Sequence, residues 1–432
     1  PLFITATCDF APYDHPLLNS LGENVLLRAN TGGIALMTTT RPVFAFSNRI
    51  MNNNYLQFAL QRDVNGNYRR LGDAIREAKN YTYQNSGDIT NNRKFTLLGD
   101  PAMQLAFPAL KLAVTRVNGI AAALADTLSA TELVNIEGEV RDWQDQLMTG
   151  FNGHVYPSVF DKSARFTTLG NDPASQPATF SSQNNVLYRG KASVTSGKFS
   201  FQFRMPKDIN YQYGNGRLSL YAEDSLKDGN GSFTQFIIGG NATDNSGDRE
   251  GPVIKAWMND ERFVNGGITD QDPVLILKLS DSSGINTAGG SLDHDIVATL
   301  DNDNRQYYVL NDFYQGDLDN YKKGEVRFQL PVLEPGHHNL HIKAWDVLNN
   351  SGETSIDFLV AKDEELQLGH VLNYPNPFST HTSFWFEHNK PGQVLQVTVQ
   401  IMTVTGRIIK ELKEQVITEG NRSTELEWDG KD

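Results

Sequence analysis

The periodicity of the apolar residues changes once along this chain, near residue 108, and this change limits the folds that the chain can adopt. Before it, strand-like and helix-like patterns alternate; after it, the helical period disappears and short alternating runs take over. Strands that alternate with helices are typical of a mostly parallel sheet covered on both faces. Short alternating strands between turn residues are typical of β-sandwiches. The pattern predicts an α/β segment followed by all-β domains.

The α/β segment is defined by short apolar runs and by apolar residues at helical spacing. The runs predict buried strands, and the helical spacing predicts helices between them. The predicted strands lie at 1–7, 34–40 and 95–98, and the predicted helices at 17–29, 50–59 and 71–78.

Two polar joints divide the β region. Residues 241–251 are polar, poor in apolar side chains and followed by Pro252, as in a linker. The acidic run at 363–365 is the second joint. We therefore expect four parts, of which the second is a β-sandwich, the third an immunoglobulin-like sandwich, and the last an incomplete immunoglobulin-like domain. Their bounds are 1–107, 108–248, 249–363 and 364–432.

Both ends of the sequence have the pattern expected for positions inside a domain. The chain opens in an apolar strand pattern at Pro1, with no initiator methionine and no signal peptide. It stops just after the turn signal Asp429-Gly430, where a partner strand would follow. We expect the sequence to be a piece of a longer protein.

The charge balance and the cysteine count exclude several classes of protein. The formal net charge is −13, from 38 basic and 51 acidic residues. This argues against a nucleic-acid partner, since phosphate binding depends on clustered cations. No apolar run approaches the roughly 18–20 residues of a membrane-spanning helix. The single cysteine, Cys8, excludes an intramolecular disulfide framework.

Cys8 directly follows the first predicted strand. In open α/β sheets, reactive groups lie at the carboxyl ends of strands, where a thiol can be activated as a nucleophile. The alternative is a small buried hydrophobic residue, which is the common role of a free cysteine. Of the nine histidines, His15 alone lies in the α/β segment, as a partner of Cys8 or as a surface or capping residue. The residues themselves leave both choices open.

Metal-binding patterns are incomplete in this sequence. Oxygen-rich loops can hold calcium, but the spacing of these acidic residues is not that of a known calcium loop, and solvated turns are the preferred interpretation. Calcium is therefore left open and not predicted. His337, His338 and His341 have no acidic or cysteine partner at a metal-binding spacing, so no metal and no cofactor is assigned. The acidic residues in question are Asp293, Asp295, Asp301, Asp303, Asp312, Asp317 and Asp319.

Three groups of motifs carry a family resemblance that covers essentially the whole chain. Residues 3–10 (Phe-Ile-Thr-Ala-Thr-Cys-Asp-Phe) and 32–41, which end in Thr-Thr-Thr-Arg, resemble the gingipain-type cysteine peptidases. Residues 98–103 (Leu-Gly-Asp-Pro-Ala-Met) are similar to the motif that closes their catalytic domain. Within the family, the arrangement looks most like the signal peptidase (sortase) of the type IX secretion system of Bacteroidetes. Its last immunoglobulin-like unit is matched by 372–378, 404–407 and 428–430.

The resemblance implies the C-terminal part of a caspase-like α/β domain at 1–107, with Cys8 as the nucleophile. It implies a general-base histidine upstream of the cysteine, a position that would precede Pro1 and that this sequence lacks. It also implies an enzyme on the extracellular face of the outer membrane, held by a β-barrel anchor protein. Such an enzyme removes the C-terminal signal domain of secreted protein cargo and joins the cargo to anionic lipopolysaccharide.

Two other functions remain open at this point. One is a secreted gingipain-like protease whose β units are accessory domains. The other is a non-catalytic surface adhesin in which Cys8 is structural.

Overall fold

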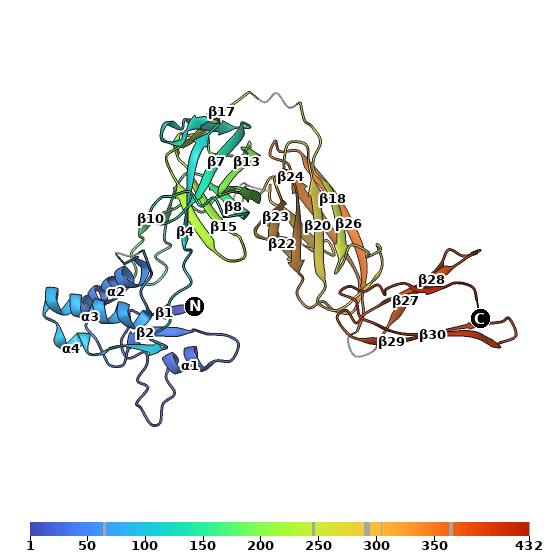
Figure 1. The fold of residues 1–432 in the computed structure, drawn as a ribbon, viewed down its shortest axis with the longest axis horizontal. Coiled ribbons are helices and arrows are strands. Elements are labelled where there is room, and N and C mark those ends of the chain that lie inside the picture. The colour runs from blue at the N-terminus through green and yellow to red at the C-terminus, as the bar shows by residue number, and fades with distance from the viewer. Residues whose placement is uncertain (64–65, 244–246, 289–293, 304, 363–365, 432) are drawn as a thin grey trace. The chain divides into compact units, whose positions relative to one another are not determined.

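The computed structural model describes residues 1–63, 66–243, 247–288, 294–303, 305–362 and 366–431. They form two compact units, 1–108 and 109–432 (Figure 1). Part of the predicted linker (244–246), the acidic joint at 363–365 and Asp293 lie outside the described residues. Strands make up 45% of the protein and helices 12%, so the fold is mostly β.

The first unit contains a counterpart of each predicted strand and helix, together with one short helix that the sequence pattern did not indicate. In chain order the elements are β1 (Leu2–Ile4), α1 (Leu21–Leu27), β2 (Ala35–Thr39), α2 (Ala45–Leu60), α3 (Leu71–Ser86), α4 (Ile89–Asn92) and β3 (Phe95–Gly99).

The sheet of this unit corrects the predicted fold class. The described strands form a three-stranded sheet in the order β1-β2-β3, with β1 parallel and β3 antiparallel to β2. The strands that the structure describes therefore do not form the mostly parallel, caspase-like α/β core that was predicted. The connections between the strands explain this. One helix, α1, links β1 to β2 and returns the chain to the end of the sheet where β1 began. Two long helices, α2 and α3, lie between β2 and β3 and carry the chain away and back, so β3 runs in the opposite direction.

Both faces of this small sheet carry helices. Met37 of β2 belongs to a core with Tyr55 of α2, Ala78 of α3 and Phe95 of β3. On the opposite face α1 lies so close that a Cβ atom at Gly22 would be 2.5 Å from Ala11 Cβ and 3.0 Å from Leu36 Cδ2. The first turn of α1 is closed by a capping box between Ser20 and Glu23.

The second unit begins with a closed barrel where a two-sheet sandwich was predicted. Seven described strands pair in the circular order β8-β12-β13-β7-β4-β16-β15, and β15 returns to pair with β8. Alternating burial shows only that one face of each strand is covered, and a closed sheet meets that condition as well as two stacked sheets. The strands are β4 (Leu110–Val117), β7 (Leu133–Arg141), β8 (Gly153–Phe160), β12 (Ala192–Thr195), β13 (Lys198–Arg204), β15 (Arg217–Glu223) and β16 (Asp228–Phe233).

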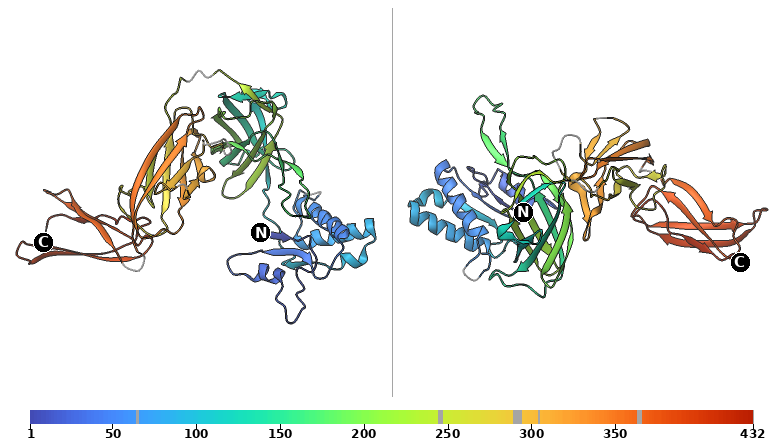
Figure 2. Two further views of the ribbon diagram at one scale, coloured as in Figure 1. Left: turned by 180° about the vertical axis from the view of Figure 1, so that it is seen from behind. Right: turned by 90° about the horizontal axis from the view of Figure 1, so that it is seen from above.

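Aromatic side chains fill the barrel. Phe199, Phe201 and Phe203 alternate along β13 and are buried, and Tyr188 stacks on Phe203 with ring centroids 4.5 Å apart. Shorter elements accompany the barrel: β5 (Ile120–Ala121), η1 (Ala122–Leu124), β11 (Val186–Arg189), the small sheet of β6 (Thr127–Ala130), β14 (Gly214–Asn215) and β17 (Ile237–Asn241), and a hairpin of β9 (Ala164–Thr167) and β10 (Thr179–Ser182). The green hairpin extends away from the barrel strands in the right-hand view of Figure 2.

Two sheets follow and enclose a second core. Leu277 of one sheet and Ile342 and Phe358 of the other are among its buried residues. The first sheet contains β18 (Val253–Met258), β20 (Val274–Ser280), β24 (Asn320–Gln329) and β23 (Tyr314–Asp317). The second contains β19 (Ile268–Thr269), β26 (Ser351–Val360), β25 (Gly336–Trp345), β21 (Val297–Leu300) and β22 (Tyr307–Val309), and the short helix η2 (Asn311–Phe313) precedes β23.

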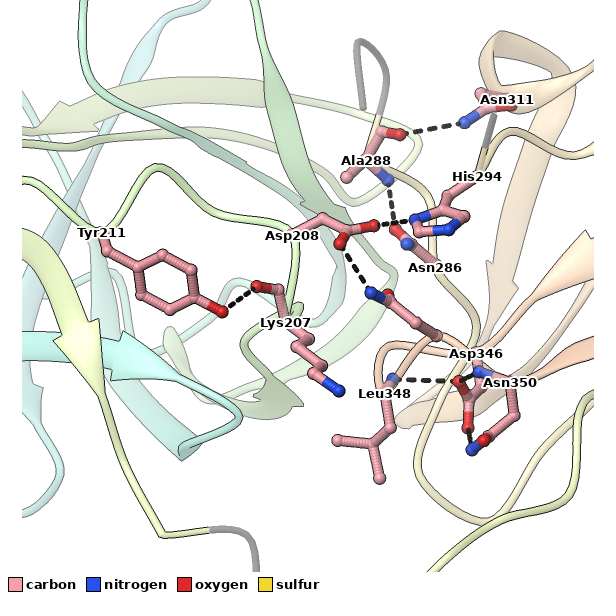
Figure 3. Close-up of polar contacts among 11 residues, drawn as sticks. Lys207, Asp208, Tyr211, Asn286, Ala288, His294, Asn311, Asp346, Leu348 and Asn350 are labelled. Carbon is pink, nitrogen blue, oxygen red and sulfur yellow. Dashed lines mark hydrogen bonds and ion pairs between the residues drawn. The ribbon is translucent and has the colours of Figure 1, made fainter. Parts of the chain in front are cut away.

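Polar contacts join the barrel region to these sheets (Figure 3). The carboxylate of Asp208 forms an ion pair with His294 and accepts a hydrogen bond from Asn349 Nδ2 at 2.7 Å. The imidazole of His294 lies against Trp345, with ring centroids 4.3 Å apart.

The last part of the chain forms a three-stranded and a two-stranded sheet. These are β27 (Leu368–Tyr374), β28 (Thr382–His388) and β31 (Leu426–Trp428), and the pair β29 (Leu395–Met402) and β30 (Ile408–Val416). The domain bounds proposed within 109–432 remain predictions. Among the described residues, no helix combines the length and the hydrophobicity needed to cross a membrane.

Candidate active site

Cys8 lies at the edge of the sheet where the two parallel strands of the first unit end. It follows the end of β1 by four residues, and Val43 follows the end of β2 by the same number. The Sγ atom of Cys8 donates a hydrogen bond to the carbonyl of Val43 at 3.1 Å, and the Val43 amide lies 3.5 Å from the same sulfur. Parallel strands bring their carboxyl ends to one edge, so the two loops meet there.

The threonines of the Thr-Thr-Thr-Arg block hold the loop of Cys8. Thr39 Oγ1 donates to the Thr7 carbonyl at 2.7 Å, and the Ala11 amide donates to the Thr39 carbonyl at 3.0 Å. The hydroxyls of Thr5 and Thr38 also bond to each other. The backbone on both sides of the cysteine is thereby fixed to β2.

The thiol is exposed and faces an open cleft of about 700 Å³. Among the described residues, the Cys8 side chain is therefore not part of a buried core. One part of the lining is apolar and comes from β1 and the two loops, and the other part is the polar face of α2. The cleft is lined by Ile4, Ala6, Thr7, Cys8, Val43, Ala45, Asn48, Arg49, Asn52, Asn53 and Leu56.

The polar face of α2 was not identified from the sequence. Asn48 and Asn52 are buried, and Asn52 Nδ2 donates to both Oδ1 and the carbonyl of Asn48, at 2.6 and 3.0 Å. Arg49 is exposed, with its guanidinium 5.5 Å from the centroid of the Phe46 ring. The signal was present as polar residues at helical spacing between the apolar positions of α2.

His15, the histidine of the first unit, is bonded to its own loop and not to Cys8. His15 is exposed, and its Nδ1 accepts a hydrogen bond from the Leu17 amide at 3.3 Å. The other eight histidines belong to the second unit. In the described part of the chain, no histidine bonds to the thiol, so these residues supply no general base in contact with Cys8.

The acidic residues singled out in the sequence are dispersed. Asp301 bonds to His338, Asp303 pairs with Arg305, Asp312 with Arg189, and Asp319 accepts hydrogen bonds from Ser193. His341 faces Glu353 at 3.5 Å on the neighbouring strand. Each of these carboxylates has its own partner, so the described ones do not form one group.

A different set of carboxylates comes together in the second unit. Ligand atoms of Asp248, Asp281 and Asp346 all lie within 4.8 Å of one another, a spacing at which carboxylates could hold a metal ion. Burial, together with the charges of Asp346 and Asp248, raises the pKa of Asp281 to about 6. Burial likewise raises the pKa of Asp346. No spacing pattern in the sequence indicated this set, because its members are distant along the chain and are brought together by the fold.

Comparison with known proteins finds similarities for the first unit. Residues 1–106 match the sequence model of Peptidase family C25. No curated protein matches the chain. Among solved structures, the chain is similar to dimeric latent PorU from Porphyromonas gingivalis, with 26% identity and a TM-score of 0.40, over 92% of this chain and 38% of that one. It is also similar to the Arg-specific cysteine proteinase gingipain R, with 12% identity and a TM-score of 0.24, over 54% and 45%.

The family resemblance predicted for the first residues is thus confirmed. This match supports a function related to that of the cysteine peptidases. The chain spans about two-fifths of the length of the PorU chain that it matches.

Proposed function

We propose that Cys8 is the nucleophile of a cysteine peptidase or transpeptidase. The observation that carries the proposal is the exposed thiol in a cleft at the carboxyl ends of β1 and β2, within the residues that match Peptidase family C25. A thiol at this edge is accessible to a peptide and is surrounded by fixed backbone. These are the conditions for attack on a carbonyl carbon.

The proposed reaction proceeds through a thioester. The thiol of Cys8 gives up its proton to a general base, which the described histidines do not supply. The thiolate then attacks the carbonyl carbon of a peptide, and the π-electron pair of the C=O bond moves to oxygen. Backbone amides stabilise this oxyanion, typically by about 3–4 kcal/mol for each donor. The C–N bond then breaks, and the leaving amine takes a proton from a general acid that the described residues do not supply. Water resolves the thioester in hydrolysis, and an amine resolves it in transfer.

The narrower assignment concerns the cargo and the acceptor. The enzyme removes the C-terminal signal domain of cargo secreted through the type IX system, and the cargo carbonyl is passed to an amine of anionic lipopolysaccharide. The location is the extracellular face of the outer membrane, with a β-barrel protein as anchor. The sequence motifs that resemble this type of sortase, from residues 3–10 to the C-terminal 428–430, support the assignment.

The test is the replacement of Cys8 in the full-length protein. We expect Cys8→Ala to abolish cargo maturation without a change in thermal stability, because the side chain is exposed. Leu17→Ala, an exposed change in the same unit, is the matched control. Full activity of Cys8→Ala would refute the proposal and favour a non-catalytic adhesin.

Deletion of the gene separates the two enzyme functions. A sortase predicts cargo that keeps its C-terminal domain and is shed into the medium. A secreted protease of broad specificity predicts cargo that matures normally, and this result would refute the narrower assignment.

A further inference from the structure

Arg49 stands out as the charged side chain of the Cys8 cleft. Of the residues that line the cleft, only Cys8 and Arg49 are ionisable. No carboxylate among the described residues pairs with Arg49, whereas Arg41 bonds to Asp14 and Arg69 to Glu77. Charge that is unpaired at the wall of a cleft attracts ligands of the opposite sign.

The guanidinium of Arg49 is also held in place. It lies over the ring of Phe46, 5.5 Å from the centroid, one helical turn away on α2. An arginine stacked on an aromatic ring keeps its donor edge free for a bidentate bond with a carboxylate. Less freedom is then lost on binding, because the side chain is already ordered by the ring.

The charge of the surrounding unit has the same sign as Arg49. Residues 1–108 contain ten lysines and arginines and eight acidic residues, in a chain whose net charge is −13. The first unit therefore carries a small positive charge although the whole chain is acidic. An anionic substrate would meet no opposing carboxylate in the cleft.

We propose that the cleft recognises a peptide with an aspartate or glutamate close to the bond that Cys8 attacks, and that Arg49 binds this side chain. The inference rests on the proposed function of Cys8. The apolar part of the lining, from Ile4, Val43 and Leu56, favours a peptide over a hydrated phosphate group.

The first experiment measures how the charge of Arg49 affects the reactivity of the Cys8 thiol, and it does not require enzymatic activity. Cys8 is the single cysteine of the chain, so its alkylation by iodoacetate, an anion, and by neutral iodoacetamide can be followed by mass spectrometry. We expect Arg49→Gln to lower the ratio of the iodoacetate rate to the iodoacetamide rate about two- to fivefold at low salt. Arg49→Glu should lower this ratio further. Arg28→Glu, exposed on the same unit and outside the cleft lining, is the control for general charge effects. An unchanged ratio in both Arg49 variants would overturn the inference.

The second experiment measures specificity in the full-length protein. Peptides that differ in one residue next to the cleaved bond, with Glu, Gln or Lys at that position, are compared by kcat/KM. We expect a preference of about tenfold or more for Glu over Lys, and its reversal in Arg49→Glu. Equal rates for the three peptides, with Cys8 still required, would overturn the inference about Arg49 and leave the proposed function of Cys8 standing. Cleavage that persists in Cys8→Ala would instead overturn the proposed function.

Discussion

Replacement of Asp281 by asparagine tests the carboxylate group of the second unit. Asp281 is half-buried and lies beside Asp248 and Asp346, and burial with these two charges raises its pKa from 3.8 to about 6. A carboxyl whose pKa is higher in the folded state than in the unfolded state favours folding when protonated. Its ionisation therefore costs stability as the pH rises from about 4 to about 6.

The size of the effect follows from the two pKa values. The difference between 3.8 and about 6 corresponds to about 3 kcal/mol at ~1.36 kcal/mol per pKa unit. Solvent reaches part of the Asp281 side chain and screens its charge, so we expect the loss of folding stability to be only about 1–2 kcal/mol. Asparagine keeps the Oδ1 acceptor for the amides of Ser283 and Gly284, at 2.7 and 3.0 Å, and removes the charge.

The assay is thermal unfolding of the wild type and of Asp281→Asn between pH 4 and pH 7. We expect the two proteins to unfold at the same temperature near pH 4, and the variant to unfold several degrees higher at pH 7. Asp272→Asn, an exposed change in the same pair of sheets, should leave the difference near zero at every pH. A difference between Asp281→Asn and wild type that does not change with pH would refute the reasoning.

Three further substitutions test the packing. Phe203→Ala removes a fully buried ring from the barrel and should cost about 3–5 kcal/mol, measured by urea unfolding, with Phe166→Ala in the exposed hairpin as the control. Gly22→Ala would place a Cβ atom 2.5 Å from Ala11 Cβ, so we expect a loss of about 1–3 kcal/mol; an unchanged midpoint would mean that α1 moves freely. Tyr55→Phe removes a buried hydroxyl that has no hydrogen-bond partner among the described residues, so stability should stay equal or rise by about 1 kcal/mol, and a clear loss would contradict this.

Local patterns predicted the elements of the first unit better than their arrangement. The apolar runs predicted the positions of β1, β2 and β3, because a strand is encoded in neighbouring residues. The predicted burial holds throughout β2 but only in part for β1 and β3. The direction of β3 was wrong, since it depends on whether α2 and α3 pack as a pair and not on the strand itself. The barrel was missed for a similar reason: the closure between β8 and β15 joins residues about sixty positions apart and leaves no mark on either strand's period.

The candidate site shows the same division. The position of Cys8 after an apolar run indicated the edge of the sheet at which it lies, although the strand β1 is only partly buried. The contact with Val43 could be seen only in the fold. Arg49 was missed because a charged residue on a helix is usually exposed to solvent on the surface. Its position in the lining of the Cys8 cleft can be seen only in the structure. Asp248, Asp281 and Asp346 come from three distant segments, so their repulsion cannot be read from any local spacing.

The closure of the barrel has a consequence for association. An open sheet ends in strands with unpaired amides and carbonyls, which can pair with another chain. Because β15 pairs with β8 over seven residues, from Arg217↔Phe160 to Glu223↔His154, the seven-stranded ring offers no such strand along this seam. Loss of the pairing between β8 and β15 would leave unpaired amides and carbonyls on both strands. The barrel should therefore resist self-association as long as it stays shut, and aggregation should begin with its opening.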